Sequence, residues 1–308
     1  MGEIKNNSEI LYLYEAIMCN PNGDPDNENK PRMDWKTRKN LVSDVRLKRY
    51  IRDYLNIVKN LDIFVRKVDG RHVDATDRVT ELLKEKTGSS DLKDANKILK
   101  LAKEKWIDVR LFGAVIPIKG EKSGGGAGQS ISITGPVQFT WGYSLNKVEL
   151  LDSATITSVF SAAKETGGTF GKDWKVKYSL LAFYGRINKY SARESDMTED
   201  DLKLLEEAIW NALETQTNTR TKIGQFPLLY MRVEMKEDSN RILGDLRQYI
   251  SIEPDENIES TKDYTLDLTR LIEKLKSADF VNKVYVKVSD GLNIKGNLED
   301  IGEKLVRL

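Results

Sequence analysis

Short apolar runs separated by charged segments predict a chain that forms a sheet with helices between its strands. Residues 9–18 (EILYLYEAIM) and 226–235 (FPLLYMRVEM) have the length and the β-branched and aromatic content of buried strands. The same kind of pattern predicts strands at 106–118, 130–145 and 178–187. Strands are therefore expected along most of the chain.

A helix is expected from about Ser43, because the apolar residues that follow recur at helical spacing. The stripe that we expect to be buried consists of Leu47, Ile51, Tyr54, Leu55 and Val58. A second helix is expected from Thr198, where acidic residues occupy the first turn, as the helix dipole favours. A third is expected between short strands within 263–290.

The order of these elements predicts an α+β fold with a ferredoxin-like core. When two insertions are set aside, residues 9–236 follow the βαββαβ order of that arrangement. Sheets of this kind often bind RNA, although the fold alone does not decide the function. The aromatic signature of ordinary RNA-recognition motifs is missing from 137–145 (VQFTWGYSL).

Composition excludes several classes of site. The 308 residues include one cysteine, Cys19, and one histidine, His72, which rules out an intramolecular disulfide, a zinc site built on cysteines and a pair of catalytic histidines. We expect His72 to be a solvated loop residue. The first residues lack the apolar core of a signal peptide, and no run of 18 apolar residues occurs. A cytoplasmic protein with no membrane partner and no cofactor is expected.

The net charge of +1 hides an uneven distribution. Residues 30–52 hold nine basic and two acidic residues, whereas 237–308 hold 11 basic and 15 acidic residues. A local positive field in a nearly neutral chain suits a defined anionic ligand, and it also suits a solvated basic face. Composition leaves both interpretations open.

Three motif-like stretches fail on their spacing. The loop at 24–35 starts like a calcium loop, but Asn29 replaces the required glycine and Trp35 the final glutamate. The stretch at 167–174 (GGTFGKDW) lacks the first glycine of a phosphate-binding loop and has Asp173 where Ser or Thr is needed. The glycines at 124–128 have no strand–helix context for a dinucleotide site.

The start of the first helix carries the sharper signal. Arg46, Lys48 and Arg49 lie in its first two turns, where cations oppose the helix dipole. Lys48 and Arg52 flank the apolar stripe, so we expect both to emerge on the surface. With the Ser43 hydroxyl and the helix amides, these cations could bind successive phosphates. Unfavourable placement for stability favours a ligand over a solvated face.

These segments resemble a known family. Residues 20–34 (NPNGDPDNENKPRMD), the helix that follows, and the stretches DVRLFGAVIP, GQSISITGPVQFTWGYSLN and YSLLAFYGRIN are similar to the guide-RNA (crRNA)-binding backbone subunit of type I CRISPR Cascade complexes, in the form of subtype I-B. The resemblance covers about residues 9–236. It implies an antiviral defence protein with crRNA, neighbouring copies of itself, other Cascade subunits and, through the guide, target DNA as partners.

The family resemblance also implies a hand-like organisation. A ferredoxin-like palm would comprise 9–58, 106–151 and 178–236. Helical fingers would occupy 59–105, a thumb hairpin 152–177, and a C-terminal α/β segment 237–308. Copies would stack along the guide RNA, with each thumb displacing one nucleotide.

Roles transfer residue by residue where the motifs match. The positions that the resemblance assigns to RNA binding are Ser43, Arg46, Lys48, Arg49, Arg52, Lys122, Ser123, Gln129, Phe170, Lys172, Trp174, Lys175, Arg220 and Lys222. They combine cations for phosphates with aromatic side chains for stacking, which suits binding that does not depend on base sequence. No catalytic or metal-binding residue is implied.

A ribonuclease is the competing expectation. Related subunits of type III complexes cleave RNA with an aspartate in the loop before this helix, where Asp24, Asp26 and Asp34 stand. Asn-Gly and Asp-Pro are strong turn formers, and aspartates in turns bind their own backbone. The motif is closer to type I, which favours a turn over a catalytic role.

Overall fold

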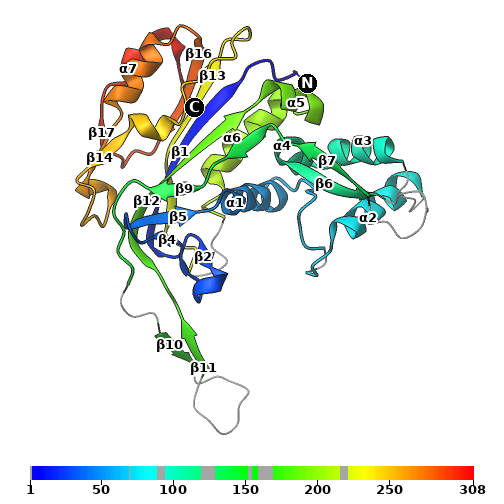
Figure 1. Ribbon diagram of the computed structural model, residues 1–308, viewed down its shortest axis with the longest axis horizontal. Coiled ribbons are helices and arrows are strands. Elements are labelled where there is room, and N and C mark those ends of the chain that lie inside the picture. Colours follow the sequence, from blue (N-terminus) through cyan, green and yellow to red (C-terminus); the bar gives the residue numbers. More distant parts are fainter. Residues whose placement is uncertain are drawn as a thin grey trace. The chain divides into compact units, whose positions relative to one another are not determined.

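The computed structural model describes residues 2–68, 70–88, 94–118, 129–151, 155–158, 169–215 and 221–308 (Figure 1). The chain divides into two compact units. One comprises Met1–Asn7, Arg49–Gln138 and Arg186–Ile209, and the other comprises Ser8–Lys48, Phe139–Gly185 and Trp210–Leu308. We call them the helical unit and the sheet unit.

The sheet unit is built on a nine-stranded sheet. Its order is β18 (Leu305–Arg307), β16 (Val281–Val288), β13 (Gln225–Met235), β1 (Ser8–Cys19), β12 (Val176–Ile187), β9 (Gly142–Ser144), β5 (Lys39–Val42) and β4 (Met33–Asp34), with β8 (Val137–Phe139) also paired to β12. The central strand β1 runs antiparallel to β13, with Ser8 opposite Glu234 and Ala16 opposite Gln225. The strands predicted at 9–18, 178–187 and 226–235 are therefore confirmed.

One core of this unit lies between the sheet and its C-terminal elements. Buried side chains of β1, β12 and β13 pack against α7 (Thr269–Ser277) and its neighbours. Those neighbours are η2 (Leu246–Tyr249), β14 (Ser251–Glu253), η3 (Thr261–Asp263), β15 (Thr265–Asp267), β17 (Ile294–Lys295) and η4 (Leu298–Lys304). The predicted helix between short strands is confirmed as α7.

The sheet unit also contains several small elements outside its main sheet. A loop after β1 contains β2 (Gly23–Asp24), η1 (Pro25–Asn27) and β3 (Lys30–Pro31). A separate two-stranded sheet pairs β10 (Thr155–Ser158) with β11 (Thr169–Lys172), and Thr155 lies directly opposite Lys172. Residues 152–154 and 159–168 of the thumb hairpin expected at 152–177 lie outside the described residues, while Thr169–Lys172 form β11.

The helical unit contains several short helices and one β-hairpin. The helices are the later part of α1 (Asp44–Ile57), α2 (Ala75–Thr87), α3 (Ala95–Lys105), α4 (Ile107–Phe112), α5 (Lys189–Ser195) and most of α6 (Glu199–Asn211), and the hairpin joins β6 (Gly113–Ile118) to β7 (Gln129–Thr134). Asp74 caps α2 by accepting from the Asp77 amide at 2.8 Å. The core of the helical unit centres on Trp106, and the centroid of the Trp106 ring lies 4.9 Å from that of the Phe64 ring.

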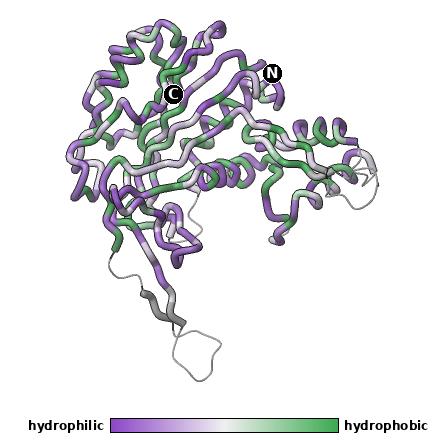
Figure 2. The backbone as a smooth tube through the Cα atoms, in the orientation of Figure 1, coloured by the Kyte–Doolittle hydropathy of each residue, from purple (hydrophilic) through white to green (hydrophobic). Residues whose placement is uncertain are grey.

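Helix α1 has the predicted amphipathic character. Hydrophobic and hydrophilic residues alternate along it in Figure 2, and Leu47, Ile51, Tyr54 and Leu55 are buried. Val58 was expected in the same buried stripe and is 48 % exposed. It follows the last helical residue, Ile57, so the helical spacing no longer directs its side chain.

The strand predicted over 106–118 is wrong for its first half. Residues Ile107–Phe112 form α4, and only Gly113–Ile118 are extended. The alternation of Ile107, Val109 and Leu111 resembled a strand, but all three are buried within a helical turn. The strand predicted over 130–145 is divided into β7, β8 and β9.

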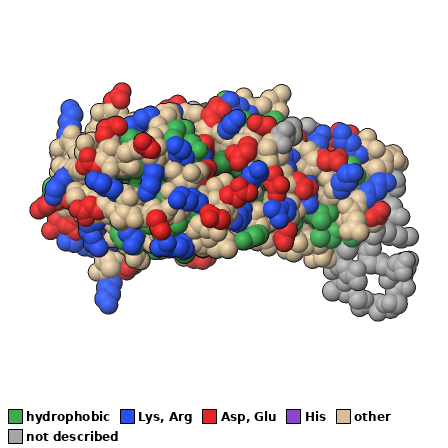
Figure 3. All heavy atoms as spheres, turned by 90° about the horizontal axis from the view of Figure 1, so that it is seen from above, with side chains coloured by type: hydrophobic (Ala, Val, Ile, Leu, Met, Phe, Trp, Pro, Cys, Tyr) green, Lys and Arg blue, Asp and Glu red, His purple; other side chains and the backbone are tan. Residues whose placement is uncertain are grey.

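Positive and negative side chains are mixed on one face of the molecule (Figure 3). Lysine and arginine side chains are interspersed with aspartate and glutamate on the face shown in Figure 3. A cluster of cations without neighbouring carboxylates would therefore differ from this face. Within the described residues, none of the helices combines the length and apolar character needed to cross a membrane.

Candidate nucleic-acid interface

A cleft of about 420 Å³ in the sheet unit brings together four segments that are distant in sequence. They are the loop after β1, the start of α1, the end of β11 and the loop before β13. The lining residues are Asn20, Asn22, Gly23, Asn29, Arg46, Lys172, Asp173, Trp174, Thr221 and Lys222.

The loop before β13 is held against the end of β1 by backbone hydrogen bonds. The Asn20 amide donates to the Thr221 carbonyl at 2.9 Å, and the Ile17 amide donates to the Gly224 carbonyl at 2.8 Å. Gly224 has a φ of +102°, and a Cβ there would lie 2.3 Å from the Ile17 oxygen. Only glycine permits this approach, which brings Thr221 and Lys222 to the cleft.

Asn22, in the loop after β1, connects that loop to the start of α1. Its Oδ1 accepts from the Ser43 amide at 2.9 Å and from the Ser43 hydroxyl at 3.0 Å. The predicted RNA contact Ser43 is buried, and its hydroxyl is engaged in holding the loop. This bond places Arg46, one turn further along α1, in the lining of the cleft.

Lys222 forms the inner cationic wall of the cleft. Its Nζ donates to the backbone carbonyls of Asn20 and, at 3.3 Å, of Pro21. Burial, together with the positive charge of Arg46, lowers the pKa of Lys222 to about 7. An anion entering between Arg46 and Lys222 would relieve this repulsion.

A second part of the lining comes from the end of β11 and the residues that follow it. Lys172 Nζ lies 2.7 Å from Glu28 of the loop after β1, and Lys30 Nζ lies 4.5 Å from the centroid of the Trp174 ring. The one lining carboxylate in the described part of the cleft, Asp173, is paired with Lys175 at 3.1 Å. The cleft therefore combines cations with an aromatic ring, which are the two groups that bind single-stranded nucleic acid.

The structure brings together four of the residues that the sequence proposed. Arg46, Lys172, Trp174 and Lys222 line one cleft, although they are up to 176 positions apart in the numbering. Lys175 neutralises Asp173 beside it. Among the other proposed positions, Lys122, Ser123 and Arg220 lie outside the described residues, as do the side chains of Gln129 and Phe170.

Lys48 and Arg52 do not emerge on the surface, so that expectation is wrong. Lys48 is 8 % exposed and lies 3.3 Å from Asp44. Arg52 Nε lies 2.9 Å from Asp108, a carboxylate 1 % exposed that also accepts from the amides of Phe64 and Val65. Both cations thus have intramolecular partners: Asp44 lies four residues before Lys48 on the same helix, whereas Asp108 is distant from Arg52 in the sequence.

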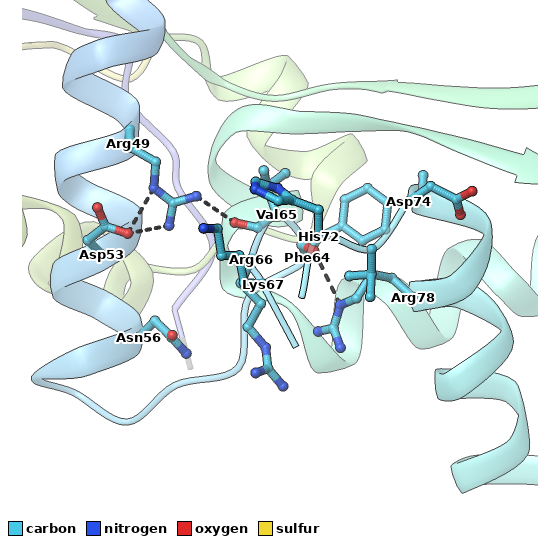
Figure 4. Close-up of a pocket in the computed structure, with 12 residues that line it drawn as sticks. Arg49, Asp53, Asn56, Phe64, Val65, Arg66, Lys67, His72, Asp74 and Arg78 are labelled. Carbon is cyan, nitrogen blue, oxygen red and sulfur yellow. Dashed lines mark hydrogen bonds and ion pairs between the residues drawn. The ribbon is translucent and has the colours of Figure 1, made fainter. Parts of the chain in front are cut away.

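Arg49 lines a different cleft, which belongs to the helical unit (Figure 4). Its guanidinium bonds Asp53 and donates to the Val65 carbonyl at 2.8 Å, so it joins α1 to the following loop. Arg78, on the far wall, is buried and bonded to Asp62 and Glu81. His72 is exposed at the rim, as expected from the sequence. Arg49 and Arg78 therefore stabilise the helical unit through intramolecular bonds.

The loop carboxylates have structural partners. Asp24 forms an ion pair with Arg32 at 3.2 Å. Asp34 accepts from the Thr37 hydroxyl at 2.7 Å and the Lys36 amide at 3.0 Å, and these bonds lower its pKa. Asp26 lies in the first turn of η1. The contacts of Asp34 are those of a turn-forming side chain, whereas Asp24 is held by an ion pair.

Sequence reasoning missed the asparagines and Lys30. The sequence predicted only a turn at the Asn-Gly pair that includes Asn22, and it predicted no role for Asn20. In the structure, Asn20 bonds Asn29 within the loop, and Asn22 bonds Ser43 at the start of α1. The density of asparagine in residues 20–29, which exceeds what one turn requires, was the available signal.

Comparison with known proteins identifies the family. The family model described as CRISPR-associated protein Cas7 matches residues 6–269. A CRISPR-associated protein Cas7 from Haloferax volcanii is 35 % identical over 317 residues, covering 98 % of this chain and 91 % of that protein.

Solved structures show the same fold at low sequence identity. A chain of a CRISPR RNA-guided surveillance complex in a pre-nicking state has a TM-score of 0.59 at 13 % identity, covering 98 % of this chain and 96 % of that one. A chain of another CRISPR RNA-guided surveillance complex has a TM-score of 0.53 at 13 % identity, covering 98 % and 94 %. The family match, the full-length relative and the shared fold lead to one conclusion: this chain is a member of the CRISPR-associated protein Cas7 family.

Proposed function

We propose that this protein is the crRNA-binding backbone subunit of a type I CRISPR surveillance complex, Cascade, and that it polymerises along the spacer of the guide RNA and presents it to target DNA. Family membership and the fold shared with chains of RNA-guided surveillance complexes support this function. Neighbouring copies and the other Cascade subunits would be its protein partners.

The observation that carries the proposal is the cleft around Arg46 and Lys222. Arg46, Lys172 and Lys222 supply positive charge, Trp174 supplies a ring, and the one lining carboxylate of its described part is paired. Cations bind phosphates of any sequence, and a ring stacks on any base. This composition suits a subunit that must hold guides of many sequences.

The proposed palm, fingers and thumb keep the boundaries expected from the family. The strand order β13-β1-β12-β9 supports a ferredoxin-like palm, since it matches the 4-1-3-2 order of a βαββαβ sheet. The paired strands β10 and β11 would belong to the thumb, and the helices between residues 59 and 105 to the fingers.

Polymerisation can be tested separately from binding. Because Thr155 and Lys172 are directly paired, residues 156–171 can be replaced by an Asn-Gly turn that joins the two strands. The cleft residues Lys172 and Trp174 remain in this variant. We expect it to bind RNA with nearly unchanged affinity and to lose cooperative assembly on long RNA, measured by sedimentation. Retained cooperativity would show that the thumb lies elsewhere.

The function itself is tested by the nucleic acid that the protein retains. Protein purified from cells expressing a CRISPR array should retain RNA of uniform length, and the Arg46→Ala, Lys222→Ala variant should not. An Arg241→Ala, Lys295→Ala variant, which removes two exposed cations outside the cleft, is the matched control. Retention of the same RNA by both variants would refute the role of the cleft.

We propose that the subunit is not catalytic. The turn-forming bonds of Asp34 and the ion pair of Asp24 support this reading. Incubation of the assembled protein with a complementary RNA and Mg²⁺ should leave that RNA intact. Cleavage that disappears on replacing Asp24, Asp26 or Asp34 by alanine would instead establish a type III-like ribonuclease.

A further inference from the structure

Asn20, which lines the cleft, has an unused hydrogen-bond acceptor. The side chain is 7 % exposed, and its Nδ2 donates to the Asn29 carbonyl at 2.7 Å, which fixes the orientation of the amide. Its Oδ1 has no hydrogen-bond partner among the described residues. A buried acceptor without a partner costs stability, and such groups in native proteins call for a ligand or water.

Trp174, another lining residue, presents the complementary group. Its Nε1 is a donor with no hydrogen-bond partner in the described part of the chain. The ring is held by Lys30, which lies over its face. One acceptor and one donor therefore lie unused in a cleft that is otherwise lined mainly by cations and amides.

A phosphate cannot satisfy the Asn20 acceptor, because an ionised phosphate has only acceptor oxygens. The group that must bond Oδ1 has to donate, and in a nucleic-acid backbone only the ribose 2′-hydroxyl does so. The same hydroxyl oxygen can accept from an indole N–H. The 2′-hydroxyl is also the group that distinguishes RNA from DNA.

We propose that Asn20 Oδ1 and Trp174 Nε1 bind a ribose 2′-hydroxyl of the guide and so make the cleft selective for RNA over DNA. This inference rests on the proposed function and adds a specificity to it. Arg46 and Lys222 attract either nucleic acid through its phosphates, and Asn20 with Trp174 reads the sugar.

Access to these atoms requires a small movement. Both atoms are shielded from solvent in the free chain. Asn29 and Lys30 belong to the loop that contacts Asn20 and the Trp174 ring. Displacement of Lys30 from the ring by a nucleotide would open the way to the indole N–H.

The test compares three oligonucleotides of one sequence: RNA, DNA and 2′-fluoro RNA. The 2′-fluoro sugar keeps the RNA-like shape and cannot donate a hydrogen bond. A lost hydrogen bond typically changes binding by about three- to tenfold. We therefore expect the unmodified protein to bind RNA about three- to tenfold more tightly than the other two, which should bind alike. Equal affinity for RNA and 2′-fluoro RNA would overturn the proposal without any protein variant.

Variants then assign the effect to its residues. Asn20→Ala should reduce the preference for RNA over 2′-fluoro RNA to near unity, Trp174→Phe should reduce it while keeping the ring, and Asn20→Asp, which keeps an acceptor, should retain it. The control is Asn22→Ala, because Asn22 lines the same cleft and its Oδ1 is already engaged by Ser43. That variant should lower the affinity for all three oligonucleotides by the same factor.

The two proposals fail in different ways. If no oligonucleotide binds in a manner that depends on Arg46 and Lys222, the proposed function fails. If RNA binds with that dependence and Asn20→Ala keeps the full preference for RNA, only the reading of the ribose fails.

Discussion

Lys172 and Glu28 form an ion pair in which the lysine Nζ lies 2.7 Å from both carboxylate oxygens. The hydrogen bonds from Lys172 lower the pKa of Glu28. Two residues further on, Lys30 lies over Trp174. In the free chain, one loop thus occupies both a cation and a ring of the cleft, so under the proposed function Glu28 and Lys30 would compete with the guide.

Removing the charge of Glu28 should therefore strengthen RNA binding. Glu28→Gln frees Lys172 for a phosphate, and because the pair is half exposed we expect a gain in affinity of only about two- to threefold at low salt. Fluorescence anisotropy with a short single-stranded RNA measures it. Glu259→Gln is the matched control, since it removes an exposed partner of Lys177 outside the cleft lining. An equal gain in the control would indicate a general effect of net charge.

Replacing two cleft cations should change the salt dependence of binding. If Arg46 and Lys222 each neutralise one phosphate, their joint replacement by alanine should lower the slope of log affinity against log salt by roughly 1.4 units for single-stranded RNA. The loss should be equal for poly-U and for mixed sequences, because phosphate contacts do not read bases. An unchanged slope across a salt series, with an unchanged melting curve, would exclude this cleft as the phosphate site.

RNA binding should weaken as the pH rises above neutrality. Burial, with the added repulsion of Arg46, lowers the pKa of Lys222 to about 7, so the free protein loses this proton well below the ordinary value of 10.5. A bound phosphate favours the protonated lysine, so binding takes up a proton between pH 7 and about 10. The nearby Cys19 stays protonated, since burial raises its pKa to about 12.

The other charged groups around the cleft are Lys172, Glu28, Lys30, Asp173 and Lys175. Burial and Arg46 lower the pKa of Lys222 to about 7, so Lys222 should dominate the change in proton binding near neutral pH. Calorimetry in buffers of different ionisation enthalpy measures the uptake, and Lys222→Arg should abolish it. Because the unfolded state binds more protons from pH 7 to about 10, the contribution of Lys222 to the free energy of unfolding should rise over the same range.

The ion pair between Arg52 and Asp108 should matter for stability. Asp108 is almost fully buried and bonds Arg52 together with the Phe64 and Val65 amides. Arg52→Ala leaves this carboxylate without its cation, which we expect to lower the free energy of unfolding by about 3 kcal/mol. Arg52→Lys should recover part of the loss, and Arg193→Ala, at an exposed ion pair, should leave the free energy of unfolding nearly unchanged. Urea unfolding gives these values, and equal effects of Arg52→Ala and Arg193→Ala would contradict the assignment.

Local patterns predicted those elements whose burial follows a simple period. For this reason, the stripe from Leu47 to Leu55 was sufficient to predict α1, and the apolar runs of β1 and β13 were sufficient to predict those two strands. The helix α4 was missed because its placement depends on long-range bonds, those of Asp108 to residues 64 and 65 and of Arg110 to Asp201 at 2.6 Å. Such partners leave no trace in a local window.

The sequence predicted which kinds of residue form the candidate site better than it predicted which individual residues line it. Arg46, Lys172, Trp174 and Lys222 were identified through the family resemblance, and they line one cleft. Lys48 and Arg52 were misplaced because their neutralising partners, Asp44 and Asp108, could not be recognised as such from charge counts. Asn20 was missed because an unpaired oxygen becomes visible only when every neighbour is known.

The pairing of β1 determines when this chain can fold during its synthesis. Both neighbours of β1 in the sheet, β12 and β13, begin at or after Val176. At about 5–20 residues per second, a ribosome that has released β1 needs on the order of ten seconds or more to deliver either partner. A largely apolar strand thus waits unpaired in the nascent chain, and we expect chaperones and translation speed to govern the yield of native protein.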